Sequence, residues 1–257
     1  MNFLDQTDRT TTAAARHFAA HEAGAVVRED AGLLMVASVN PIAKSLFYSS
    51  ARRIDRGVPP EKAVAAVCAF TGEQDTAVNL WLSLDGDRDL VAAAEAAGMS
   101  HGIELEDMAM TSPPSLPDPA PGVELVPVRD PQTADAFGDV HRALRIEADQ
   151  DPDSVLHFAS RAVLLDPRIQ AFVAYLDGTP AACAMAFRHE ETAGLFWVAT
   201  RTEARNRGLG ALVSASSVRA AFQDGAESVT LTATALGAPV YRRLGFEQFS
   251  TRMRYYC

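Results

Sequence analysis

The chain has 257 residues, of which 48% are hydrophobic and 22% charged, and its formal net charge is −10. A chain of this length can bury one large core or two ordinary ones. The negative balance argues against nucleic acid as a partner, and no apolar run is long enough to cross a bilayer. The first ten residues also lack the basic and apolar regions of a secretory signal, so we expect a cytoplasmic protein. The Ala- and Arg-rich usage is typical of a bacterial, GC-rich coding sequence.

The three cysteines, Cys68, Cys183 and Cys257, are odd in number, widely spaced and without a metal-ligand pattern. We therefore expect three inert, reduced thiols rather than a disulfide, and no bound metal.

In the first half the clearest pattern is a strand, a connector, a helix ending in Gly98-Met99 and another strand, over residues 76–110. Residues 111–122 then carry five prolines. Prolines at this density deny the segment a helix or a central strand and predict an extended, semi-rigid connector. We therefore expect domains at 1–111 and 123–257, joined by a linker at 112–122.

The second half alternates strands and helices, and several boundaries have local signals. Asp130 with Pro131 predicts a helix start, Asp177-Gly178 a tight hairpin and Gly245 a helix end. The expected strands cover 123–128, 169–176, 180–189, 193–200, 228–233 and 246–256, and the expected helices begin near 131, 154, 209 and 238. The order β-α-α-β-β-β-α-β-α-β predicts a mixed α/β sheet.

A loop rich in arginine and glycine, residues 205–210, sits where one of these helices begins. The first amides of a helix have no partner inside it, and the peptide dipoles add partial positive charge there. Glycines at 208 and 210 remove side chains that would keep an anion from the backbone, so a phosphate or pyrophosphate is the natural occupant. The alternative is a glycine-rich helix start with two solvated arginines. The loop lacks the Lys-Ser/Thr of a P-loop, and Val213 stands at the third glycine position of a dinucleotide-binding motif.

Two motifs in order resemble the GNAT superfamily of acyl-CoA-dependent N-acyltransferases. The first is the phosphate loop, matched by Arg205, Gly208 and Gly210 after a V-A-T strand end. The second is a last helix with the pattern Tyr-x-x-Leu-Gly-Phe, which begins at Tyr241. The resemblance covers residues 123–256.

The resemblance implies how coenzyme A is bound. The strand before the loop would pair with the pantetheine arm, the loop amides would take the pyrophosphate, and the amide of Val198 would polarise the thioester carbonyl. Thr234, where the family often has Asn or Ser, would hydrogen-bond the cofactor arm. The expected cofactor-binding residues are Trp197, Val198, Ala199, Thr200, Arg205, Asn206, Arg207, Gly208, Leu209, Gly210, Ala211 and Thr234.

The catalytic residues are expected from the same resemblance. Tyr241 matches the tyrosine that protonates the departing thiolate; the alternative is a core aromatic residue. The general base is open between Glu147 and the group at 189–191, which also suits a solvated hairpin turn. The acidic run at residues 147, 149, 151 and 153 is either a helix-capping loop or an acidic mouth that attracts a cationic amine.

The segment at 76–110 echoes the end of the chain, with Gly98-Met99 opposite Gly245-Phe246. Arg56-Gly57 precedes its strand by the same distance as Arg207-Gly208, but Pro59 stands in the place of Gly210 and Ala94 in that of Tyr241. We therefore expect a tandem GNAT-like fold whose first copy is degenerate, although any strand-helix-strand segment would show a partial echo. The chain would be an intrachain pseudo-dimer, either monomeric or forming a homodimer.

The expected function is transfer of an acetyl group from acetyl-CoA to a primary amine of a small molecule by direct attack in a ternary complex. The alternatives are a catalytically silent acyl-CoA sensor or scaffold, another acyl donor, or a protein amine as acceptor.

Overall fold

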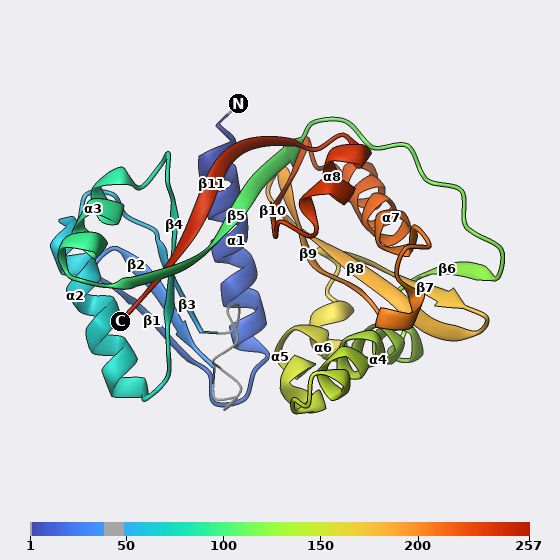
Figure 1. Cartoon of the computed structure of the whole chain (residues 1–257), viewed down its shortest axis with the longest axis horizontal. Helices are drawn as coiled ribbons and strands as arrows, with labels where there is room; N and C mark the ends of the chain where they lie inside the picture. The colour runs from blue at the N-terminus through green and yellow to red at the C-terminus, as the bar shows by residue number, and fades with distance from the viewer. Residues whose placement is uncertain (1, 39–48) are drawn as a thin grey trace. The chain divides into compact units, whose positions relative to one another are not determined.

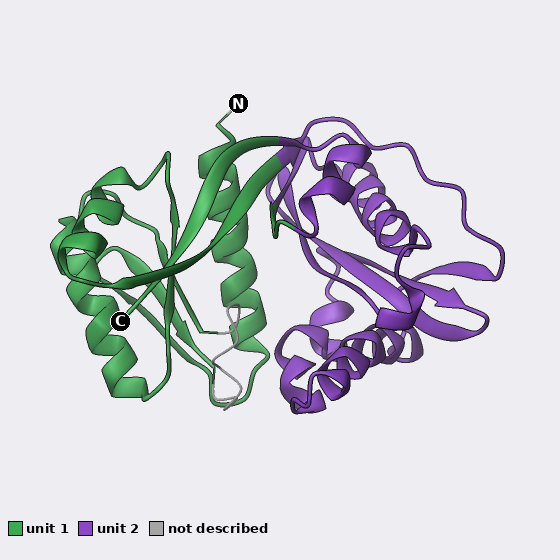
Figure 2. Cartoon of the chain, in the orientation of Figure 1, with its two compact units in different colours: residues 1–108, 232–235, 248–257 green, residues 109–231, 236–247 purple. Residues whose placement is uncertain are grey.

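The computed structural model describes residues 2–38 and 49–257. The chain divides into two compact units (Figure 2). Unit 1 comprises Met1–Met108, Thr232–Ala235 and Gln248–Cys257, and unit 2 comprises Ala109–Leu231 and Leu236–Glu247. The eleven strands within the described residues form one hydrogen-bonded sheet in the order β1-β2-β3-β4-β11-β5-β10-β9-β8-β7-β6. The mixed α/β sheet predicted from the sequence is confirmed.

Unit 1 contains three antiparallel strands, a helix, a strand parallel to the third, a second helix and two long strands. β1–β3 form the antiparallel part, β4 runs parallel to β3, and β11 runs antiparallel to β4. Its core includes Leu33, Phe70, Leu80 and Tyr255, each no more than 1% exposed. The elements are α1 (Phe3–Ala20), β1 (Val26–Asp30), β2 (Leu33–Ala37), β3 (Ser50–Arg53), α2 (Pro60–Gln74), β4 (Asn79–Ser83), α3 (Arg88–Ala96), β5 (Ser100–Met110) and β11 (Glu247–Tyr256).

Unit 2 repeats this order from β7 to its second helix, α8, and has one further antiparallel strand, β6, before it. Strands β6–β9 are antiparallel, and β10 runs parallel to β9. Figure 1 shows α7 and α8 on one face of the β7–β9 strands and α4, α5 and α6 on the other. The elements are β6 (Val123–Pro127), α4 (Pro131–Glu147), η1 (Pro152–Val155), α5 (Leu156–Ala159), α6 (Arg161–Leu164), β7 (Ile169–Leu176), β8 (Thr179–His189), β9 (Thr192–Thr200), η2 (Thr202–Ala204), α7 (Leu209–Gln223), β10 (Ser228–Ala233) and α8 (Ala238–Leu244).

The repeat expected from the sequence is present in the topology. In both halves of the chain three antiparallel strands, β1–β3 and β7–β9, lead through a helix to a strand parallel to the third, then through a second helix to a long strand. For the second half that long strand is β11, which belongs to unit 1. Gly98 and Gly245 follow the second helix of each copy with φ of +73° and +98°, a conformation that favours glycine.

Two sequence-based boundaries differ from the structure. The expected domains follow chain order, whereas the compact units place β11 with the first half, where it pairs with β4. The second predicted helix of the second half is broken into η1, α5 and α6. Ser160 interrupts it with extended backbone, and its hydroxyl accepts the amide of Val163 to start α6.

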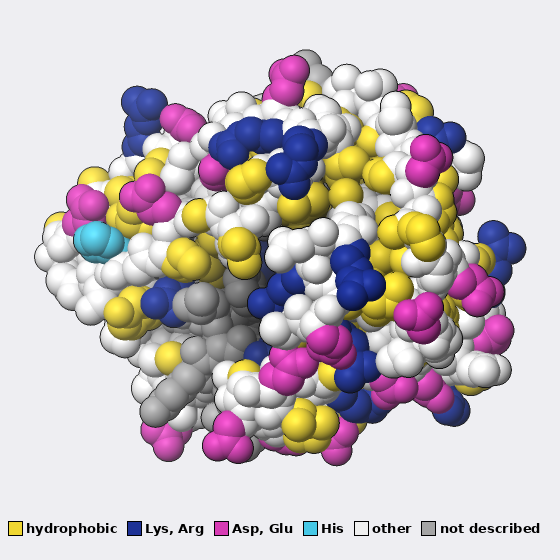
Figure 3. Space-filling view, turned by 45° about the vertical axis from the view of Figure 1, so that its right-hand side comes forward, with side chains coloured by type: hydrophobic (Ala, Val, Ile, Leu, Met, Phe, Trp, Pro, Cys, Tyr) yellow, Lys and Arg dark blue, Asp and Glu magenta, His cyan; other side chains and the backbone are white. Residues whose placement is uncertain are grey.

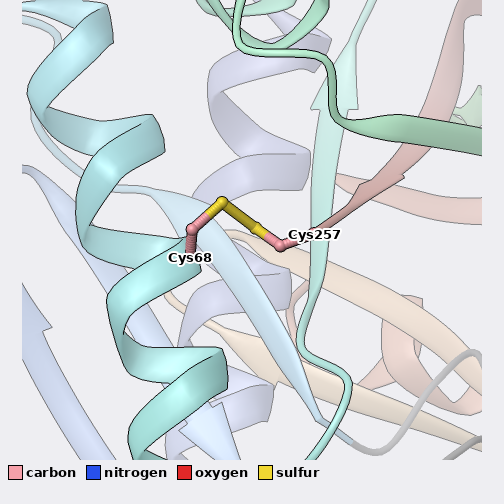
Figure 4. Close-up of a disulfide and its surroundings, with 2 residues drawn as sticks. All are labelled: Cys68 and Cys257. Carbon is pink, nitrogen blue, oxygen red and sulfur yellow. A yellow bond between two sulfur atoms is a disulfide. The ribbon is translucent and has the colours of Figure 1, made fainter.

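The prediction of three reduced thiols is wrong for two of them. Cys68 on α2 and Cys257 after β11 form a disulfide within unit 1, with 5.5 Å between their Cα atoms (Figure 4). The pairing depends on β11 lying beside β4, and a separation of 189 residues gives no sign of it. Cys183 is a free, buried thiol as expected.

Candidate functional site

The sheet of unit 2 opens along β9. The paired register of β9 with β10 covers residues 192–194, whereas β9 continues to Thr200. On its other side, Cys183 lies opposite Ala199 and Met185 opposite Phe196. Two residues, Trp197 and Val198, therefore face the single residue between those β8 positions, which defines a β-bulge. The register of β9 with β10 thus ends six residues before the strand itself does.

Trp197 at this bulge has a φ of +51°, a conformation that a bulky aromatic residue rarely adopts. Phe158 stacks on its ring with centroids 3.6 Å apart and an interplanar angle of 4°. His157 meets the same ring edge-on at 5.7 Å. The strained residue is therefore enclosed by side chains of α5.

His141 on α4 contacts the backbone of the bulge. Its Nε2 lies 3.0 Å from the carbonyl oxygen of Trp197, and its ring packs edge-on against Phe158 at 4.8 Å. Burial lowers the pKa of His141 to about 4, and that of His157 to about 3, so both rings are neutral at pH 7. Because a carbonyl oxygen only accepts, the His141 proton must sit on Nε2.

The start of α7 has the form expected of an anion site. Gly208, the N-cap, has a φ of +78°, and Leu212 N donates to its carbonyl oxygen at 3.0 Å. The amides of residues 209–211 precede this first helical bond and have no acceptor four residues back inside the helix. Residues 205–208 are exposed. A Cβ on Gly210 would lie 3.3 Å from Thr200 Oγ1, so glycine lets the helix begin close to the end of β9. The turn therefore fits a pyrophosphate.

Tyr241 lies on α8 and is half-buried. Desolvation raises its pKa to about 12, so its hydroxyl is protonated at neutral pH. Its ring packs edge-on against Phe246, which is 2% exposed, with centroids 6.0 Å apart. The side chain can therefore serve both as a packing element and as a proton donor.

The candidate bases lie at different places. Glu147, the last residue of α4, accepts a hydrogen bond from Thr202 Oγ1 at 2.6 Å, just past the end of β9. Residues 189–191 comprise the end of β8 and the β8–β9 turn, at the opposite end of β9, and the nearest of them is six residues before Trp197. This spacing corresponds to roughly 20 Å of extended chain. The assignment of Glu147 as base stays a prediction.

The remaining predicted residues occupy less defined positions. Asp151 caps η1 through the amide of Asp153, whose carboxylate lies 3.7 Å from the Arg142 guanidinium. These contacts favour the helix-capping interpretation of the acidic run. Thr234 is exposed and falls in unit 1.

His141, His157 and Phe158 lie at the site but belong to neither of the two sequence motifs. A signal for His141 was present, because it lies on the same face of its helix as Ala134 and Phe137, and all three are buried. A polar residue on an apolar helical face requires a buried partner, here the carbonyl of the bulge.

The corresponding turn in unit 1 is filled by its own side chains. Asp55 Oδ1 accepts the amide of Gly57 at 2.8 Å, and Arg56 pairs with Asp87 at 2.6 Å and with Asp8 at 3.1 Å. Helix α2 then begins at Pro60, behind a proline N-cap that has no amide hydrogen. Carboxylates thus stand against the groups that a phosphate would need, which supports the interpretation of a degenerate copy.

Among the described residues, no three His, Cys, Asp or Glu side chains are grouped so that they could hold a metal ion. Within the same residues, no helix has the length and hydropathy to cross a membrane. On the face shown in Figure 3, acidic and basic side chains are interspersed with apolar ones.

Residues 116–243 match a family model described as an acetyltransferase (GNAT) domain. The whole fold resembles a GCN5-related N-acetyltransferase from Kribbella flavida, at 20% identity and a TM-score of 0.73, covering 97% of this chain and 94% of that one. It also resembles a tandem GNAT protein from the clavulanic acid biosynthesis pathway, at 15% identity and a TM-score of 0.64, covering 92% and 84%. It resembles a GCN5-related N-acetyltransferase from Sphaerobacter thermophilus as well, at 14% identity and a TM-score of 0.58, covering 88% of this chain and 80% of that one. No curated protein matches the sequence. At these identities the structural likenesses establish the fold.

Proposed function

Because the chain belongs to the GNAT acetyltransferase family, whose co-substrate is an acyl-CoA, we propose that it transfers an acetyl group from acetyl-CoA to a primary amine of a small molecule. The observation that carries this proposal is that the bulged strand β9 ends beside the first turn of α7. The register of β9 with β10 ends at residue 194, and the strand is bulged at Trp197. Its last residue, Thr200, lies close to the first turn of α7, where a Cβ on Gly210 would be 3.3 Å from Thr200 Oγ1.

The binding roles follow from this arrangement. The amides of residues 209–211, with Arg205 and Arg207, would hold the pyrophosphate, because a helix start concentrates donors and positive potential. The backbone of residues 198–200 would pair with the pantetheine arm, as a neighbouring strand would. Bound acetyl-CoA supplies an acyl group already activated as a thioester.

The chain's catalytic contribution would be alignment and charge stabilisation. In a ternary complex the amine attacks the acyl carbon directly, so holding both reactants in place lowers the barrier. The Val198 amide at the bulge would donate to the oxygen on which negative charge develops. Tyr241 would then protonate the sulfur as its bond to the acyl carbon breaks, a role suited to a hydroxyl that stays protonated at neutral pH.

The acceptor must arrive as an ammonium and lose a proton before it attacks. Glu147 stays our candidate for that base, directly or through water, since its carboxylate lies beside the end of β9. The net charge of −10 favours the approach of a cationic amine.

The proposal is tested by titrating the protein with acetyl-CoA in a calorimeter and then measuring thiol release over a panel of small amines. Gly210→Glu should abolish binding, because it places a bulky anionic side chain in the turn. Gly72→Glu on α2 is the matched control: it adds the same charge where nothing lies within 4 Å of the new Cβ. Wild-type protein that does not bind acetyl-CoA would refute the proposal.

Tyr241→Phe separates catalysis from binding. We expect coenzyme affinity to survive while turnover falls by about 10²-fold or more, in the range of a lost general acid. Tyr175→Phe on β7 is the control for loss of a phenol elsewhere in unit 2. Unchanged turnover in Tyr241→Phe would show that Tyr241 serves packing alone.

A further inference from the structure

The hydrogen bond from His141 falls on the peptide group that the proposed mechanism uses. The carbonyl oxygen of Trp197 and the amide nitrogen of Val198 belong to the same peptide unit. This peptide bond is trans, so its C=O and N–H point in opposite directions. A donor that fixes the carbonyl therefore fixes the direction of the amide.

The peptide needs such fixing because the bulge removes regular ladder contacts. Trp197 and Val198 of β9 both lie opposite a single residue of β8, and the register of β9 with β10 has ended before this point. Trp197 also has a φ of +51°, and backbone strained in this way persists only where the surrounding structure holds it.

We propose that His141 is a positioning residue: its Nε2–H holds the Trp197 carbonyl toward α4 and thereby aims the Val198 amide away from α4, at the thioester oxygen. This inference rests on the proposed function, since it assumes an acyl-CoA along β9. It adds a residue from a helix that carries neither of the two sequence motifs.

The environment of His141 suits this role. The ring is 8% exposed and packs against Phe137 and Phe158. Because Nε2 faces the Trp197 carbonyl oxygen, the neutral ring must carry its proton on that nitrogen. A buried donor bonded to a backbone carbonyl in a low-dielectric site is costly to break, because the carbonyl would lose its partner. The side chain is thus held on the bulge in a single tautomer.

The test compares His141→Gln, whose side-chain amide can reach the carbonyl as a donor, with His141→Leu, which cannot donate. In wild type, the carbonyl stretch of bound ¹³C-labelled acetyl-CoA should lie below its value in water, because the Val198 amide polarises it. We expect His141→Leu to lose most of that shift and His141→Gln to keep most of it. Turnover should fall about 10- to 100-fold in His141→Leu, below the loss seen when an oxyanion donor is removed outright, with affinity for acyl-free coenzyme A unchanged.

Phe137→Leu is the control for destabilisation. It removes packing from the same cluster without touching the hydrogen bond, so the carbonyl shift should remain at wild-type value. If His141→Leu does not fold, two measurements still test the positioning role. They are the carbonyl shift of acetyl-CoA bound to His141→Gln and the Nε2–H resonance of His141 in wild type. Absence of acetyl-CoA binding to wild type overturns the proposed function. Normal binding with an equal carbonyl shift in wild type and His141→Leu, or a wild-type ring protonated on Nδ1, overturns the positioning role alone.

Discussion

Reduction of the Cys68–Cys257 disulfide should destabilise the chain strongly. The bond closes a loop of 189 residues, and a cross-link of that span removes roughly 5 kcal/mol of chain entropy from the unfolded state at 25 °C. Unfolded-state structure reduces this value, so 5 kcal/mol is an upper limit. For a chain of this size the corresponding fall in Tm is roughly 10–20 °C. The measurement is thermal and denaturant unfolding under oxidising conditions and in the presence of a reductant.

Variants separate the bond from general effects of the reductant. Cys68→Ser and Cys257→Ser should each unfold like the reduced wild type, and neither should respond to reductant. Cys183 keeps its buried thiol in all of these proteins. Equal stability of oxidised and reduced wild type would refute the reasoning, because it would mean that the bond does not form or does not constrain the unfolded chain.

Three further predictions follow from the structure. Because carboxylates fill the turn of unit 1 at Gly57, calorimetry should give one coenzyme per chain, and a stoichiometry of two would contradict the degenerate copy. Because the pKa of Tyr241 is raised to about 12, its acid form persists through pH 10, and turnover should decline only as the pH approaches 12; a decline centred near pH 10 would show an unperturbed phenol. Arg252→Met should cost about 3–5 kcal/mol in urea unfolding, because it leaves Asp107, 0% exposed, without the guanidinium 2.9 Å away. Arg16→Met, which breaks an exposed pair at 2.7 Å, should cost under about 1 kcal/mol.

The parts of the fold that the sequence predicted have local causes. Asp130 and Pro131 start α4 through a capping box with Thr133. Asp177 and Gly178 both adopt positive φ in the β7–β8 turn, as a two-residue hairpin requires. In each case neighbouring residues determine the conformation, so a short window of sequence contains the information.

The parts that the sequence did not predict depend on distant pairing. The bulge exists because β8 and β9 have different numbers of residues between matched positions, and neither strand shows this alone. The disulfide likewise depends on where β11 pairs. The site shows the same contrast. Gly208 and Gly210 predict an anion turn from a short stretch of sequence, whereas the residues that hold the adjacent strand come from the distant helices α4 and α5 and belong to no motif.

The free energies of the strain at Trp197 and of the contacts around it explain why Phe158 and His141 are aromatic and buried. A left-handed conformation at a bulky residue costs on the order of 1–3 kcal/mol. A stacked aromatic pair such as Phe158 on Trp197 contributes about 0.5–1.5 kcal/mol beyond its buried area, and a hydrogen bond such as that from His141 about 1 kcal/mol. The two contacts together are of the same size as the strain, so both contribute to offsetting it. Substitution of Phe158 by Leu should therefore weaken the bulge even with His141 intact, and should appear as a smaller carbonyl shift for bound acetyl-CoA. An unaltered shift in that variant would mean that β8 alone holds the strand in its bulged form.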